Sequence, residues 1–120
     1  MTNIFFDEKK QVLIWEFNDL ITIYDILDSI EKINEYSYKN EIKIYCSATD
    51  SLLAIRYEEL PYAAEKIQNI LNYFTEIKLS IVVNNPKTTA FFYMAFIDIQ
   101  KDNLTSKVFS TEKAAKEWLF

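Results

Sequence analysis

The sequence predicts a single α/β domain with the element order ββαβαβαβα, in which four helices cover a five-stranded mixed but mainly parallel sheet. The first indication is that two kinds of segment alternate along the chain. In one kind every second residue is apolar, as in strands, and in the other apolar residues recur every three or four positions, as in helices. The second is the length, because 120 residues suit one hydrophobic core. The third is that no linker or repeat divides residues 1–120, so we expect one domain.

A predicted hairpin opens the chain. Its strands, at Asn3–Phe6 and Val12–Phe17, are joined by a short polar connection. The second strand carries apolar side chains on both faces, which predicts that it is covered on both sides. The pair therefore adds an antiparallel edge to the sheet.

A helix and a third strand are expected next. Between Thr22 and Tyr36 the apolar residues recur at helical spacing, and Thr22 with Asp25 resembles a capping pair. Alternation predicts a strand at 42–48. The segment 48–57 is predicted to be an irregular loop of roughly ten residues, and loops of that length often carry function.

The second half of the chain continues this alternation. An apolar stripe predicts a helix over 60–74 with Pro61 in its first turn, and a fourth strand is expected at 77–83. Asn85 and Pro86 are typical of an N-cap and a first helical residue.

That third helix is predicted to reach Lys101. A fifth strand at 104–109 and a last helix, capped by Ser110 or Thr111, complete the order.

The composition excludes several kinds of site. The chain contains no Gly, which excludes the phosphate-binding loops that need glycine. It also contains no His, which excludes Ser-His-Asp and Cys-His catalysis and the common zinc motifs. We therefore expect no enzyme activity, no cofactor and no metal site.

The charge argues against nucleic acid as a partner. Thirteen Lys and Arg against eighteen Asp and Glu give a net charge of −5, and the basic residues are scattered. Two Glu-x-Lys pairs, Glu41/Lys43 and Glu76/Lys78, have the form of a nuclease half-site, but on such an acidic chain they indicate solvated strand ends.

The sequence predicts a cytoplasmic protein without stable membrane insertion. The N-terminus lacks the basic start and long apolar run of a secretory signal. The densest apolar stretch, 90–97, is far short of the roughly 20 residues that span a bilayer. The lone Cys46 lies in a strand-like apolar run and is expected to be a buried small hydrophobe.

The third predicted helix is unusual because it has two apolar faces. Either its neighbours cover the second face, or that face forms a dimer contact or the wall of an apolar-ligand pocket. Exposed tyrosines nearby would extend the same surface. The candidate interface or apolar-ligand surface comprises Phe91, Phe92, Tyr93, Phe96, Ile99, Tyr57 and Tyr62.

Two stretches resemble the SpoIIAA-like superfamily, whose fold is shared by STAS domains and small STAS/SEC14-type bacterial proteins. Residues 79–85 resemble the passage from strand to third helix, and residues 107–119 resemble the closing strand and helix. The resemblance covers essentially the whole chain and implies a SpoIIAA-like (STAS-like) fold. Neither stretch is catalytic.

The resemblance also implies a candidate phospho-acceptor. Anti-sigma-factor antagonists of this superfamily carry a phosphorylatable Ser at the start of the second helix, and Ser51 occupies the corresponding position beside Asp50. The sequence departs from that pattern because Leu52 and Leu53 replace the second Ser and the Gly. Asp50 and Ser51 are more simply explained as part of a turn.

Three functions remain open from the sequence. The first is a non-enzymatic STAS-like binding or regulatory module that contacts a protein partner or forms a homodimer. The second is a carrier or sensor of a small apolar or lipid ligand, suggested by the SEC14-type relatives. The third is a phospho-switch of the anti-sigma-antagonist type at Ser51.

Overall fold

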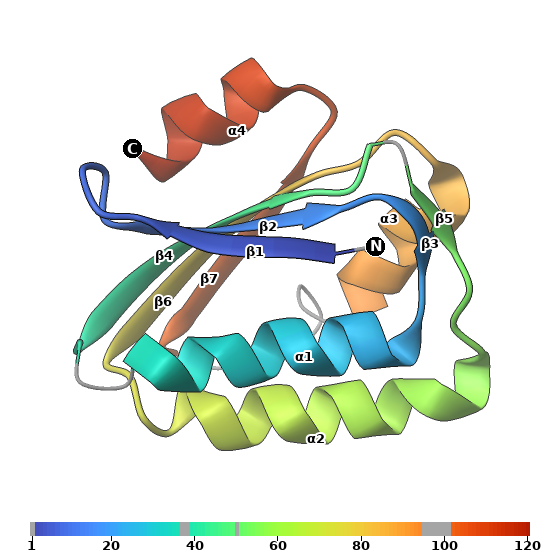
Figure 1. Ribbon diagram of the computed structural model, residues 1–120, viewed down its shortest axis with the longest axis horizontal. Helices are drawn as coiled ribbons and strands as arrows, with labels where there is room; N and C mark the ends of the chain where they lie inside the picture. The colour runs from blue at the N-terminus through green and yellow to red at the C-terminus, as the bar shows by residue number, and fades with distance from the viewer. Residues whose placement is uncertain (1, 37–38, 50, 95–101) are drawn as a thin grey trace.

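The centre of the molecule is a five-stranded sheet with the strand order β1-β2-β4-β6-β7 (Figure 1). The computed structural model describes residues 2–36, 39–49, 51–94 and 102–120. Strands β1 and β2 are antiparallel, and the other neighbouring pairs are parallel, which confirms the predicted mixed, mainly parallel sheet. The strands are β1 (Thr2–Asp7), β2 (Val12–Phe17), β4 (Glu41–Ser47), β6 (Glu76–Val82) and β7 (Leu104–Phe109).

Helices cover both faces of this sheet. Helices α1 (Ile23–Ile33) and α2 (Leu60–Leu71) lie side by side on one face, and α4 (Glu112–Leu119) lies on the other (Figure 1). Helix α3 (Pro86–Phe92) packs at the end of the sheet where β6 finishes. Because β2, β4 and β6 are adjacent and parallel, right-handed crossovers place α1 and α2 on the same face.

The predicted helix starts are confirmed. The Thr22 hydroxyl accepts a hydrogen bond from the Asp25 amide, and the Asp25 carboxylate accepts one from the Thr22 amide at 2.8 Å. The Asn85 side chain accepts from the amides of residues 87 and 88 at the start of α3. Of the two candidate caps for α4, Thr111 is the one used.

Two hydrophobic cores lie on opposite faces of the sheet. The main core, between the sheet and α1 and α2, contains Trp15, Phe91 and Phe92. The smaller core lies under α4 and contains Val12, Tyr45, Val82, Ala115 and Leu119. Strand β2 contributes to both cores, which confirms that it is covered on both sides.

The expected loop at 48–57 is wrong in part. A second, two-stranded parallel sheet forms between β3 (Asp19–Ile21) and β5 (Ser51–Leu53), and the 3₁₀ helix η2 (Tyr57–Glu59) follows. Strands of three residues are too short to show a reliable period in the sequence. A second 3₁₀ helix, η1 (Asn34–Tyr36), continues from α1.

One predicted helix end differs from the structure, and another falls outside the described residues. Helix α2 ends at Leu71, and Phe74 lies beyond it although its side chain is buried. Helix α3 ends at Phe92, and the predicted continuation over 95–101 lies outside the described residues. Within the described part of the chain, no helix combines the length and the apolar character needed to cross a membrane.

Candidate functional site

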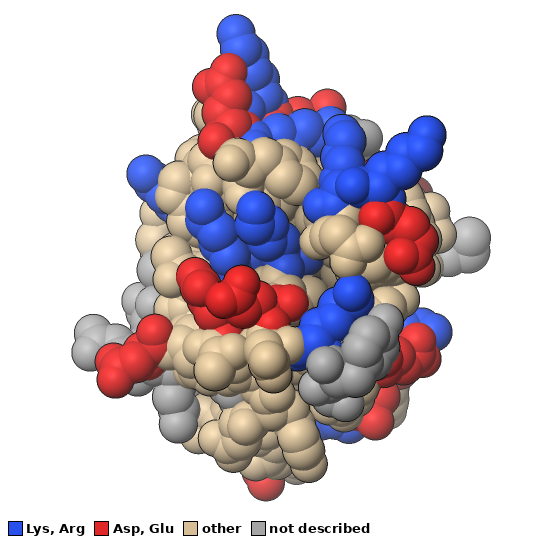
Figure 2. All heavy atoms as spheres, turned by 90° about the vertical axis from the view of Figure 1, so that its left-hand side faces the viewer, with Lys and Arg blue, Asp and Glu red and all other residues tan. Residues whose placement is uncertain are grey.

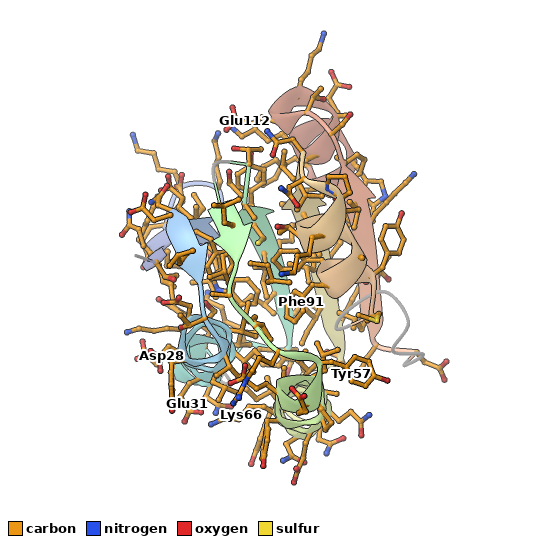
Figure 3. The ribbon with its side chains drawn as sticks, turned by 90° about the vertical axis from the view of Figure 1, so that its right-hand side faces the viewer. Asp28, Glu31, Tyr57, Lys66, Phe91 and Glu112 are labelled. Carbon is orange, nitrogen blue, oxygen red and sulfur yellow. The ribbon has the colours of Figure 1, made fainter. Side chains whose placement is uncertain are left out.

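An apolar hollow of about 210 Å³ opens beside β5, which we call the β5–α3 cleft. Figure 3 shows the side of the molecule on which it lies, with Phe91 toward the interior and Tyr57 at the surface. Segments distant in the sequence form its walls: β5 with the chain that follows it, η2, the start of α2, and α3. Its lining residues are Leu53, Ile55, Arg56, Tyr57, Leu60, Lys87, Ala90, Phe91 and Met94.

Local hydrogen bonds fix both walls of the cleft. The Ala54 amide donates to the Ile21 carbonyl oxygen at 2.8 Å, which ties the segment after β5 to β3. The Arg56 amide donates to the Glu59 carboxylate at 2.8 Å, which holds the turn into η2. Opposite them, the Asn85 cap sets the start of α3. The cleft is therefore preformed by ordinary secondary structure.

The rim of the cleft is positively charged. Arg56 and Lys87 both line it, although the whole chain has a net charge of −5. The Arg56 side chain is 80% exposed and its Nε lies 3.7 Å from the Glu59 carboxylate, so that ion pair is weak. Both cations remain accessible to an acidic group beside the apolar lining.

The predicted interface residues separate into different environments. Tyr57 is 79% exposed and Phe91 forms part of the cleft wall. Tyr62 and Tyr93 are exposed but do not line the cleft. The expectation that Phe92 belongs to an exposed surface is wrong, because its side chain is fully buried in the main core. Its ring centroid lies 6.3 Å from that of Phe17, a residue of β2.

Two predicted interface residues, Phe96 and Ile99, lie outside the described residues. Several cleft residues were not predicted as functional, among them Leu53, Ile55 and Met94. The run Leu52-Leu53-Ala54-Ile55 was a usable signal, because four apolar residues in a supposed solvent loop need a partner.

The candidate phospho-acceptor Ser51 is neither in a loop nor in a turn. It is the first residue of β5, it is only 3% exposed, and its hydroxyl donates a hydrogen bond to the Phe17 carbonyl oxygen. Phosphorylation would place a dianion in this buried position, which is costly. The structure therefore contradicts an accessible phospho-switch at Ser51; Asp50 lies outside the described residues.

The two Glu-x-Lys pairs meet at one end of the sheet. The register of β4 and β6 places Glu41 beside Glu76 and Lys43 beside Lys78. Figure 2 faces this end and shows lysine side chains next to a group of carboxylates. Both glutamates are exposed, as expected of solvated strand ends.

Lys78 has a structural role at that end. Its Nζ donates a hydrogen bond of 2.7 Å to the Trp118 carbonyl oxygen and lies over the Trp118 ring. It thus binds the last turn of α4, where a cation is favourable.

Groups with reactive potential are few among the described residues. Cys46 is fully buried, and burial raises the pKa of its thiol well above the usual range, which agrees with an inert core residue. Among the described residues no cluster of three acidic or thiol side chains could hold a metal ion.

Comparison with known proteins gives a likeness of fold. No family model matches the sequence, and no curated protein matches it significantly. The crystal structure of an uncharacterised DUF3478-family protein from Shewanella loihica PV-4, described as having a SpoIIAA-like fold, is similar over 100% of this chain and 93% of its own, with a TM-score of 0.64 and 13% sequence identity. The sequence resemblance and the arrangement of strands and helices agree with this likeness, and the chain therefore has a SpoIIAA-like fold.

Proposed function

We propose that the chain is a non-enzymatic, STAS-like binding module that recognises a partner protein through the β5–α3 cleft. The observation that carries this proposal is a preformed apolar hollow with Tyr57 and two cations on its rim. Its volume of about 210 Å³ is below the roughly 300–1,000 Å³ typical of small-molecule pockets. A hollow of that size suits one anchoring side chain of a partner.

The lining defines the chemistry of the partner. An aliphatic or aromatic anchor fits between Leu53, Phe91 and Met94, and a neighbouring carboxylate would pair with Arg56 or Lys87. Tyr57 adds a rigid, amphipathic ring, which is the type of side chain enriched at binding hot spots. We therefore expect a segment that carries an apolar anchor beside an acidic residue.

Carriage of an apolar ligand has less support. The hollow inside the main core, between the sheet and α1 and α2, measures only about 20 Å³, which is room for about one water molecule. A lipid chain would have to use an open surface hollow such as the β5–α3 cleft. The non-enzymatic part of the proposal rests on the absence of His from the sequence and on the burial of Cys46.

The test compares matched variants in affinity purification from native cells. Tyr57→Ala with Met94→Ala removes cleft contacts, whereas Tyr24→Ala with Tyr73→Ala removes exposed side chains elsewhere. We expect one or more proteins to be enriched by the wild type and the control variant and lost by the cleft variant. An identical set of bound proteins for all three chains would refute the proposal, and recovery of only the chain itself would replace it with self-association.

A further inference from the structure

Strand β1 forms an open edge of the sheet. Among the described residues it pairs only with β2, in an unbroken register from Thr2 opposite Phe17 to Asp7 opposite Val12. Figure 1 shows no other labelled strand beside its outer side. Its backbone groups on that side are a template for another strand.

The sequence of β1 lacks the usual protection of an edge strand. Edges are commonly blocked by Pro, Lys or a bulge, and Thr2–Asp7 has none of these. The opposite edge strand, β7, carries the exposed Lys107 near its middle. Strand β1 instead carries Phe5 near its middle, and this side chain is 43% exposed.

Both flanks of the β1 edge are hollowed and acidic. On the α1 side, a hollow of about 290 Å³ is lined by Ile4, Asp28, Glu31, Lys32 and Glu35. On the α4 side, a groove of about 210 Å³ has apolar residues along its floor and five charged residues, Asp7, Lys10, Glu16, Glu112 and Lys116. Figure 3 shows Asp28 and Glu31 on the outer side of α1. The two hollows are lined by six carboxylates and three lysines.

Existing ion pairs cancel only part of this excess, and Lys39 also lies over the Phe6 ring of β1. Lys32 pairs with Glu35 at 3.1 Å, and Lys66 of α2 pairs with Glu31 at 2.6 Å. Asp28 is exposed and takes part in neither pair. The edge therefore attracts cations, and a second copy of this chain would bring the same acidic flanks against it.

We propose that the β1 edge binds an extended, lysine- or arginine-rich segment of a partner protein by strand addition. The segment hydrogen-bonds to the open backbone of β1, and its alternate side chains contact Ile4 on one face and Phe5 on the other. Its cationic side chains lie near Asp28 and Glu16. This surface shares no lining residue with the β5–α3 cleft, so it is independent of the function proposed above.

The probe is a capped synthetic peptide of about eight alternating lysine and valine residues, a typical strand length. The matched control replaces every lysine with glutamate. Binding to the isotopically labelled chain is followed by amide chemical shifts and amide hydrogen exchange. We expect the lysine peptide to shift and protect amides of β1, with an affinity that falls as salt is raised, and we expect the glutamate peptide not to bind.

Charge-reversal variants separate a specific site from general attraction. Asp28→Lys with Glu35→Lys is expected to lower the affinity for the lysine peptide about tenfold. The control, Glu58→Lys with Glu65→Lys, makes the same change of net charge on η2 and α2 and is expected to change this affinity little.

Equal weakening by both double variants, shifts confined to residues outside β1, or no binding of the lysine peptide would overturn the proposal. A chain that sediments as a dimer, and that Phe5→Lys converts to a monomer, would show that the occupant is a second copy instead.

Discussion

Replacing Phe92 tests the assignment of the aromatic residues of α3 to core or surface. The Phe92 ring is fully buried, with its centroid 5.3 Å from that of Phe91 and 6.3 Å from that of Phe17. Burying a Phe side chain is worth about 1.5–3 kcal/mol, and the cavity left by truncation raises the cost of Phe92→Ala to about 3–5 kcal/mol. The total stability of such a domain is about 5–15 kcal/mol.

The measurement is urea denaturation followed by fluorescence, with Tyr93→Ala as the matched control. Tyr93 is the next residue and is 44% exposed, so its truncation is expected to cost less than about 1 kcal/mol. Phe92→Leu, expected to cost about 1 kcal/mol, keeps the comparison informative if the alanine variant does not fold. Similar losses for Phe92→Ala and Tyr93→Ala would refute the assignment of Phe92 to the core.

The remaining predictions concern α4, the first helix cap and the thiol. Lys78→Met should destabilise the chain by about 1 kcal/mol in urea denaturation, because it removes the hydrogen bond to the Trp118 carbonyl oxygen, whereas Lys113→Met on the exposed side of α4 should change little. Burial raises the pKa of Asp25, but hydrogen bonds from the Thr22 amide and from threonine hydroxyls outweigh it and hold the pKa below 3.8. The stabilisation by the ionised Asp25 carboxylate is therefore present above pH 3.8 and is lost as the pH falls through the lower folded-state pKa. In thermal denaturation, the difference in melting temperature between wild type and Asp25→Asn should shrink in acid. A difference that stays constant with pH would contradict this linkage. Cys46 should react with a thiol reagent only as fast as the chain opens, and rapid reaction of the native protein would contradict its burial.

Most of the architecture could be predicted because long elements have a clear period. Strand β2 was predicted with its observed bounds, and the caps at Thr22 and Asn85 were predicted from residue type alone. The short strands β3 and β5 were missed because pairing between distant segments, rather than local pattern, makes them strands. Because Ser51 belongs to β5, its burial was not predicted either.

The candidate site was harder to predict than the fold. Helical spacing could show that the third helix was apolar on two sides, but which side faces the sheet depends on packing. That packing buries Phe92 and leaves Met94 about half exposed beside the cleft. Lys87 and Arg56 are far apart in the sequence, and only the fold places both on one rim.

Photocross-linking from position 57 tests most directly whether the chain acts by binding at the β5–α3 cleft. A photoreactive phenylalanine analogue replaces Tyr57 in one chain and Tyr24, which is 74% exposed on α1, in the other. Irradiation in native cells is expected to yield a discrete product from position 57, with the label in a partner segment that carries an apolar residue beside an acidic one, and no such product from position 24. Equal products from both positions, or none from position 57, would contradict the proposed function.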